Sequence, residues 1–379
     1  MRGASAIVGL VALSVTVGCT LPSTFHAIRQ ELAALPAEPA SPADPELRRF
    51  KGVVHVHTHL SHDSRGDEDE IVRAARAAGL DFVMLTDHNR PAIFESGMAG
   101  ERNGVLLIRG AEFRCDDQYL LAVGIDRFLD PQGLTCAEVA TAITAQGGLP
   151  IGAHPNRLTL WDEPSVAGVE VWDLYDEAKT HRWRYLAWAL DVAVWYGTYP
   201  GEILSRTIRR PDRALAAFDQ QTTRRRLTAV ATPDAHQNVR VLGRQLDPYP
   251  LAFRLVPLYV LAPDRTRDGL LAALRQGRVY FAFEVFKPAP DFEFRVIDGT
   301  GTAWHMGDEV PVAHGLTVEV FAPHRGLITV LRDGRPVAHA EAARLSLPAP
   351  GAGVYRAEVA LSVQGQWRPW IFSNPIYVR

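Results

Sequence analysis

Short apolar runs alternate with amphipathic segments from residue 49 to residue 285. The apolar runs predict strands, and they are GVVHVHTH (52–59), DFVMLTDHN (81–89), GVLLIRGAEFR (104–114), QYLLAVGI (118–125), LPIGAHP (149–155), GVEVWD (168–173), RLTAVATPDAH (226–236) and LYVLAP (258–263). Segments between them, such as DEDEIVRAARAAGL (67–80), have the apolar spacing of helices. This alternation indicates an α/β fold with a parallel sheet covered on both faces, and the number of strands favours a closed or nearly closed barrel.

The pattern changes after about residue 286. The segments DFEFRVID, LTVEVFAP, LITVLRDGRPVAHA, GVYRAEVAL and WIFSNPIYVR alternate polar and apolar residues, and helical spacing is absent from them. Asp333-Gly334 lies between two such runs and predicts a tight hairpin turn. We therefore expect residues 286–379 to form a small immunoglobulin-like β-sandwich that follows a barrel at 49–285.

The first residues contain an apolar run that is too short to span a bilayer. It covers residues 4–17, an arginine precedes it, and Gly18-Cys19 follows it, as in a bacterial lipoprotein signal. We expect residues 1–18 to be a signal peptide and Cys19 to carry a lipid anchor in the bacterial cell envelope, with the protein facing the periplasm or the exterior. A secreted protein is the alternative. The Pro/Ala-rich residues 19–48 predict a tether with one short helix in FHAIRQELAAL.

Charge and cysteine content refine this picture. The formal net charge is −3, and the basic clusters at 206–210 and 224–226 have no interleaved aromatic residues, so no nucleic-acid partner is predicted.

A second apolar segment is WRYLAWALDVAVWYG (183–197). It carries Asp191 and is too short to span a membrane, so we expect a buried or interfacial helix there. Cys115 and Cys136 could form a disulfide in an exported protein or remain two buried thiols.

Histidines and carboxylates gather where the predicted strands end. His55 and His57 are two residues apart on one strand and therefore share a face, and Asp234 and His236 repeat this spacing. The carboxyl ends of strands in a parallel barrel converge on one mouth. Each residue alone could be structural, but their shared position indicates one site made of His55, His57, Asp63, His88, Glu112, His154, Asp234 and His236.

The residue types in this set indicate transition metals. Imidazoles mixed with carboxylates suit zinc, manganese or iron better than calcium or magnesium. The set holds more ligands than one ion needs, which predicts at least two metals with a bridging carboxylate such as Glu112. Paired ions can activate a water and clamp the attacking and leaving oxygens of a phosphoester.

Five blocks of the chain resemble, in this order, the signature blocks of the PHP (polymerase and histidinol phosphatase) metallohydrolases. They are HVHTHLSHD (55–63), LTDHN (85–89), GAEF (110–113), GAHP (152–155) and PDAH (233–236). The resemblance covers about residues 50–284 and implies a distorted (β/α)7 barrel with two or three divalent transition metals and, most often, phosphoesterase activity. The barrel followed by a β-sandwich resembles exported or membrane-anchored PHP-domain proteins of bacteria.

The resemblance also implies how the ligands are divided. Those of a first metal are His55, His57, Glu112 and Asp234. Glu112 bridges to a second metal that His154 also binds, and the ligands of a third metal are Asp63, His88 and His236. His59 and His62 match no ligand position of the family. The chain departs from the family at Gln118-Tyr119, where a histidine is usual, so Tyr119, Asp116 or Asp117 would have to supply the missing ligand of the second metal.

These observations predict a metal-dependent hydrolase of a small-molecule ester. The first hypothesis is a phosphoesterase that uses a metal-bridged hydroxide, with Arg114 as a candidate phosphate contact. The second is a related metallohydrolase of a carbamate, ester or amide, which a largely apolar mouth without cations would favour. The third is a non-catalytic envelope binding protein whose metal site is degraded, which the Gln118-Tyr119 departure would favour.

Overall fold

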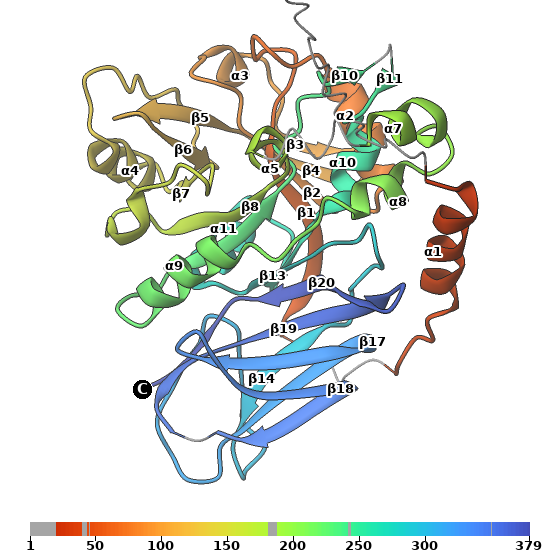
Figure 1. The fold of residues 1–379 in the computed structure, drawn as a ribbon. Helices are drawn as coiled ribbons and strands as arrows, with labels where there is room; N and C mark the ends of the chain where they lie inside the picture. Colours follow the sequence, from red (N-terminus) through yellow and green to blue (C-terminus); the bar gives the residue numbers. More distant parts are fainter. Residues whose placement is uncertain (1–19, 40–43, 45, 181–187, 242–243, 350) are drawn as a thin grey trace, which may run out of the picture.

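The computed structural model describes residues 20–39, 44, 46–180, 188–241, 244–349 and 351–379 (Figure 1). The predicted signal peptide at 1–18 and the predicted anchor Cys19 lie outside the described residues. The described chain comprises a mixed α/β part and a C-terminal all-β part, which is drawn in blue at the bottom of Figure 1.

The larger of the two main sheets runs through both parts of the molecule. Its continuous path is, in order, β15 (Ala303–His305), β14 (Glu293–Ile297), β17 (Thr317–Arg332), β19 (Gly353–Val363), β20 (Gln366–Ser373), β13 (Val279–Ala282), β12 (Leu258–Ala262), β1 (Arg48–Val56), β2 (Phe82–Leu85), β4 (Val105–Ile108) and β3 (Gly100–Arg102). Strand β18 (Arg335–Pro348) pairs with β17, and β21 (Ile376–Val378) pairs with β19 and with β16 (Glu309–Val310). The pairing of β13 with β20 therefore joins the α/β part to the all-β part.

The second main sheet belongs to the α/β part alone. Its order is β5 (Gly110–Cys115), β6 (Gln118–Val123), β7 (Leu149–Gly152), β8 (Gly168–Asp173) and β9 (Thr228–Thr232). The expectation of a parallel sheet holds in part: β1, β2 and β4 are parallel to one another, as are β7, β8 and β9. It is wrong elsewhere, because β6 is antiparallel to both β5 and β7, and β12 is antiparallel to both β1 and β13. The tight β5–β6 turn leaves no room for the crossover helix that parallel pairing requires.

The predicted strand GVLLIRGAEFR is divided between the two sheets. Its first half is β4 and its second half is β5. A Cβ at Gly110 would lie 2.3 Å from the carbonyl oxygen of Ala122, so glycine permits the close backbone approach there. In the described residues the only β-bridges between the two sheets are Val56 with Ala235 and His88 with Glu112, so a continuously hydrogen-bonded closed barrel is not seen.

Helices cover the strands of the α/β part. They are α2 (Glu68–Ala77), α3 (Ala92–Glu95), α4 (Cys136–Ala145), α5 (Leu174–Thr180), α7 (Ala189–Trp195), α8 (Pro200–Ser205), α9 (Asp212–Thr222), α10 (Tyr249–Leu255) and α11 (Arg267–Gln276), with a 3-10 turn at Leu160–Asp162 and a small hairpin of β10 (Arg240–Val241) and β11 (Arg244–Gln245). Sequence signals set several helix ends: Thr135 and Glu138 form a capping box at α4, and Gly277 ends α11 with φ +83°. Cys115 and Cys136 form a disulfide that ties the end of β5 to the start of α4.

The all-β part only partly matches the expected sandwich. Asp333 and Gly334 both have positive φ and join β17 to β18, which confirms the predicted hairpin turn. The immunoglobulin-like arrangement is not shown, because β14, β17, β19 and β20 lie on one continuous path of paired strands. This part packs on the α/β part through a buried charge cluster in which Arg356 of β19 pairs with Asp219 of α9 at 2.5 Å.

The expected tether contains a packed helix. Helix α1 (Pro22–Ala34) buries Phe25 completely, in a cluster with Val192, Tyr196 and Ile203. Residues 183–187 of the predicted buried or interfacial segment lie outside the described residues, and residues 189–195 of it form α7. Among the described residues, no helix is both long enough and apolar enough to cross a membrane.

Candidate metal centre

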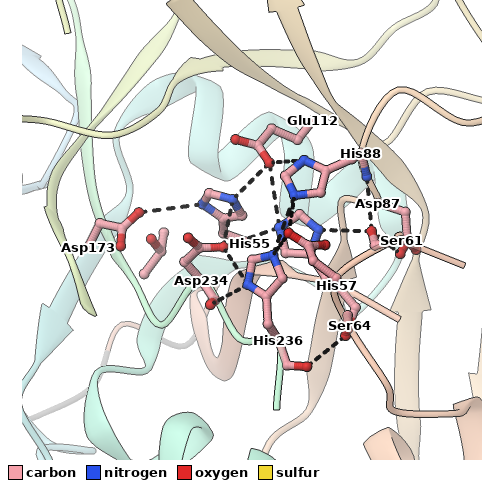
Figure 2. A network of polar contacts seen from close by, with 12 residues as sticks. His55, His57, Ser61, Ser64, Asp87, His88, Glu112, Asp173, Asp234 and His236 are labelled. Atoms are coloured by element: carbon pink, nitrogen blue, oxygen red, sulfur yellow. Dashed lines mark hydrogen bonds and ion pairs between the residues drawn. The ribbon is translucent and has the colours of Figure 1, made fainter. Parts of the chain in front are cut away.

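His55 lies at the end of β1, His57 follows it, and both are held against the segment that follows β9. The His57 N–H donates to the carbonyl of Ala235 at 3.0 Å, and the Ala235 N–H donates to the carbonyl of His55 at 3.1 Å. Asp234 and His236 flank Ala235. The two backbone bonds therefore bring four predicted ligands from distant parts of the sequence into one cluster (Figure 2).

Three predicted ligands have left-handed backbone conformations. The φ angles are +65° at His55, +59° at His154 and +41° at Asp234. Such a conformation costs a residue other than glycine on the order of 1 kcal/mol. It persists where the surrounding structure fixes it, and residues of this kind concentrate at functional sites.

The innermost atoms of the cluster come from His55, His57, Glu112 and Asp234. The Nε2 atoms of His55 and His57 lie 3.1 and 3.2 Å from Oδ1 of Asp234. The same two nitrogens lie 3.5 and 3.6 Å from Oε2 of Glu112. All four atoms are buried, and apart from close contacts among the predicted ligands themselves none has a hydrogen-bond partner among the described residues. Buried polar atoms without partners cost about 1–3 kcal/mol each, so two nitrogens and two oxygens that converge in this way fit a bound transition-metal ion.

A second set of atoms lies toward the surface. Oδ2 of Asp63 is 3.3 Å from Nε2 of His88 and 3.4 Å from Nε2 of His236, and these two nitrogens are 3.4 Å apart. Oδ1 of Asp63 is buried and has no hydrogen-bond partner among the described residues. These three residues can hold a further ion. His62 is exposed beside them, with Nε2 3.8 Å from Asp63, whereas His59 is exposed and belongs to none of the groupings found.

Glu112 links the innermost ligand atoms to His154 and to the ligand atoms nearer the surface. Its Oε1 atom is 2.9 Å from Nε2 of His154, and its Oε2 atom is 2.7 Å from Nδ1 of His88. Glu112 lies in the middle of β5 and not at the end of a strand, contrary to the expectation. It reaches the cluster because the isolated bridge with His88 sets β5 across the end of β2. The structure thus brings all eight predicted ligands together, and their roles as ligands remain a prediction.

Where the family usually has a histidine, this chain has Tyr119, and its ring contacts a predicted ligand. The ring of Tyr119 lies edge-on to His154, with centroids 5.0 Å apart. Asp116 accepts a hydrogen bond from the N–H of Cys136, and Asp117 pairs with Arg114. Of the three residues suggested as a replacement ligand, Tyr119 is therefore the one that lies against the predicted ligands.

Two buried carboxylates of β8, which the sequence did not predict as site residues, hold predicted ligand histidines. Oε1 of Glu170 accepts from Nδ1 of His55 at 2.7 Å, and its Oε2 accepts from the N–H of His154 at 2.7 Å. Asp173 lies 3.2 Å from Nδ1 of His154. Carboxylates that hold the outer nitrogen of a ligand histidine fix the ring and direct its other nitrogen toward the metal. The available signal was the presence of two acidic residues in the wholly buried strand GVEVWD.

His57 is oriented in a similar way by a neutral partner. Its Nδ1 atom lies 3.1 Å from Oγ of Ser61, whose hydroxyl donates to Asp87 at 2.7 Å. Asp87 also accepts the backbone N–H of Thr58 at 2.8 Å. Asp87 therefore fixes the loop that follows β1 and does not point into the metal cluster (Figure 2).

Burial and neighbouring charges shift the pKa values of several residues in the cluster, and the direction differs from residue to residue. Burial, helped by nearby His236, lowers the pKa of His57 to about 3. Burial also disfavours the charged form of His88, but hydrogen bonds to Asp63 and Glu112 outweigh it and raise the pKa of His88 to about 10. Burial, together with the charges of Asp234 and Glu170, raises the pKa of Asp173 to about 7. The metal-free cluster therefore holds protons on some histidines that a metal ion would displace.

The cluster opens into a cleft of about 550 Å³ whose lining includes four cations and, besides the predicted ligands, one carboxylate, that of Asp176. Its cations are Arg90, Arg114, Arg157 and Lys179. Arg114 pairs with Asp117 at 2.5 Å, whereas the other three cations form no salt bridge within the described part of the chain. Arg114 was predicted from the sequence, and the other three were not.

Comparisons with known proteins agree with the residue pattern. The PHP domain family matches residues 54–166, a range that includes the predicted ligands from His55 to His154 but not Asp234 or His236. The uncharacterized protein MJ1587 of Methanocaldococcus jannaschii is 28% identical over 144 residues, which cover 33% of this chain and 83% of that protein.

Two solved structures are also similar. One is a two-domain protein of Bacteroides vulgatus that contains a predicted PHP-like metal-dependent phosphoesterase; it is 16% identical, with a TM-score of 0.44, and the match covers 90% of this chain and 99% of that one. The other is a candidate metal-dependent phosphoesterase of Bifidobacterium adolescentis; it is 16% identical, with a TM-score of 0.34, and the match covers 52% of this chain and 92% of that one.

Proposed function

We propose that the protein is a metal-dependent phosphoesterase. The observation that carries this proposal is the combination of unpaired metal-ligand atoms with a cationic cleft directly above them. A hydrolase of neutral esters, amides or carbamates has no need for several cations at its mouth, whereas a phosphate group carries negative charge that arginine and lysine neutralise. A degraded site in a binding protein would not keep the four buried atoms of His55, His57, Glu112 and Asp234 convergent, with no hydrogen-bond partner outside the predicted ligands.

Each group of residues has a distinct task in this proposal. The eight predicted ligands hold two or three divalent ions, with zinc, manganese and iron as the candidates. When bound, such ions activate water and neutralise charge on a phosphoryl group. Arg90, Arg157 and Lys179 bind and orient the phosphate oxygens at the mouth. Glu170 and Asp173 hold the imidazoles of His55 and His154 in place.

We infer that the two sheets together form the distorted seven-stranded barrel that the family resemblance implies. Support comes from a ring of contacts: β1 pairs with β2, a bridge leads from His88 to Glu112 of β5, strands β5 to β9 are paired in order, and a bridge leads from Ala235 back to Val56 of β1. Both bridges involve or adjoin predicted ligands, so the places where the barrel is least regular coincide with the site.

The test is hydrolysis by metal-loaded protein of p-nitrophenyl phosphate, bis-p-nitrophenyl phosphate and p-nitrophenyl acetate. Turnover of either phosphate ester is expected, and Arg157→Gln should lower kcat/KM for it while the metal content stays unchanged. Arg213→Gln, an exposed arginine of α9 away from the cleft, is the matched control. Turnover of the acetate alone would favour the carboxylic-ester hydrolase, and metal binding without any turnover would favour a binding protein.

We also propose that the protein is anchored to the cell envelope by a lipid on Cys19. The support is the Gly18-Cys19 pair that follows the apolar run of residues 4–17 in the sequence. Radiolabelled palmitate should be incorporated by cells that express the wild-type chain and not by cells that express Cys19→Ser. Equal incorporation, or none in either case, would contradict the anchor.

A further inference from the structure

An apolar cavity of about 240 Å³ lies beside the cationic cleft. Its walls come from α5, α7, α8 and the residues around the β10–β11 hairpin, and its apolar lining includes Leu174, Val192, Ile203, Leu204 and Leu246. Helices α7 and α8 contact each other, and α8 also contacts α10. Voids of this size are uncommon inside packed protein, whereas binding pockets are typically apolar with a few polar groups.

The cavity is connected to the metal centre by shared residues. Tyr175 and Asp234 line both the cavity and the cleft. The ring of Tyr175 lies 5.9 Å from that of His236, and 39% of this tyrosine is exposed. Val239, which also lines the cavity, is 37% exposed. The cavity thus borders the predicted ligands on one side and has exposed apolar residues at its rim.

The two neighbouring spaces have opposite character. The cleft presents four cations around the predicted metals, and the adjoining cavity presents aliphatic and aromatic side chains. A ligand that fills both must carry an anionic group at one end and an apolar group a few atoms away. A small sugar phosphate or inorganic phosphate would leave the apolar cavity hydrated.

We propose that this cavity binds the apolar part of the substrate, so that the substrate class is an amphiphilic phosphate ester with an alkyl or aryl group on its alcohol side. This inference rests on the proposed phosphoesterase activity and goes beyond it by assigning the leaving-group subsite. The phosphate lies in the cationic cleft, and the alcohol portion passes Tyr175 into the cavity.

The experiment compares ethyl phosphate with hexyl phosphate by phosphate release from the metal-loaded protein. Burial of hydrocarbon favours binding by about four-fold per methylene group, the ratio that corresponds to about 0.8 kcal/mol. The wild-type protein should therefore prefer hexyl phosphate in kcat/KM, by on the order of 100-fold if all four additional methylenes are buried. Ala178→Phe places a ring in the cavity from α5, and it should remove most of this preference while ethyl phosphate turnover is retained.

Matched controls separate the outcomes. Ala217→Phe changes another half-buried helical alanine, in α9, and should keep the preference for hexyl phosphate. If Ala178→Phe does not fold, Leu246→Gln, which makes the cavity polar, is expected to lower the preference instead. Equal kcat/KM for the two esters in the wild-type protein, or an equal loss for both in Ala178→Phe, would overturn the subsite and leave the phosphoesterase intact. Absence of turnover with both esters would overturn the subsite, and it would overturn the phosphoesterase as well if neither p-nitrophenyl phosphate nor bis-p-nitrophenyl phosphate is hydrolysed.

Discussion

Substitution of Glu170 by glutamine probes the metal centre without removing a ligand. The carboxylate of Glu170 is fully buried and accepts three hydrogen bonds, each of 2.7 Å, from Nδ1 of His55, from the N–H of His154 and from Oγ1 of Thr232. Glutamine has nearly the same shape, but it has no charge and only one acceptor oxygen. If its oxygen faces His55, its NH₂ group faces the N–H of His154, and two donors oppose each other.

The structure gives the expected size of the effect. One buried donor without an acceptor costs about 1–3 kcal/mol of folding stability. Loss of a carboxylate that holds a ligand histidine lowers metal affinity by about 10–100-fold, which corresponds to about 1.4–2.7 kcal/mol. Glu170→Gln should therefore lower both the free energy of unfolding and the affinity for zinc, although Glu170 is not among the predicted ligands.

The assay is competition for Zn²⁺ between the protein and a chromophoric chelator at fixed pH. Glu293→Gln is the matched control, because Glu293 is also buried and also contacts a histidine, with Oε1 2.9 Å from Nδ1 of His305, but it lies in the all-β part away from the metal cluster. The control should lose stability and keep its zinc affinity. Unchanged zinc affinity in folded Glu170→Gln would refute the argument that this carboxylate supports the metal site.

Three further predictions concern stability. Arg356→Ala leaves the carboxylate of Asp219 without its buried partner and should lower the free energy of unfolding in urea by about 3–5 kcal/mol; a loss below about 1 kcal/mol would contradict this. Arg210 and Arg356 outweigh the effect of burial and lower the pKa of Glu358 below 4.5. The ion pairs of Glu358 should therefore stabilise metal-free protein above pH 4.5, and this stabilisation should decrease as the pH falls below 4.5. An identical pH dependence of stability in Glu358→Gln would count against this. Removal of metal by a chelator should lower Tm, and added Zn²⁺ or Mn²⁺ should restore it; a Tm that does not respond to either would argue against a bound metal.

Site residues could be predicted from the sequence when they stood at the end of an apolar run. His55, His57, Asp234 and His236 could be predicted because their spacing on strands places them on shared faces. Glu170 and Asp173 could not be assigned in this way, because their strand GVEVWD resembles any buried strand until its neighbours in space are known. Arg90, Arg157 and Lys179 lie in loops or on a short helix, where sequence gives little information on which side chains face a cleft.

The fold was predicted less completely than the site. Alternation of strands and helices indicated an α/β part, but local pattern does not distinguish parallel from antiparallel pairing, and β5, β6 and β7 are antiparallel. The division of one apolar run into β4 and β5 depends on the close approach at Gly110, which is a tertiary contact. Pairing of Cys115 with Cys136 likewise depends on a Cα–Cα distance of 5.1 Å that the spacing of 21 residues does not determine.

The most direct test of the central claim is a metal titration of chelator-stripped protein, with p-nitrophenyl phosphate turnover followed against equivalents of Zn²⁺ or Mn²⁺ bound per chain. We predict that turnover appears only as a second equivalent binds, because Glu112 joins a buried set of predicted ligands to the set that lines the cleft. Full turnover without bound metal, or no turnover with two or more equivalents bound, would contradict the assignment of this cluster as a metal-dependent phosphoesterase site.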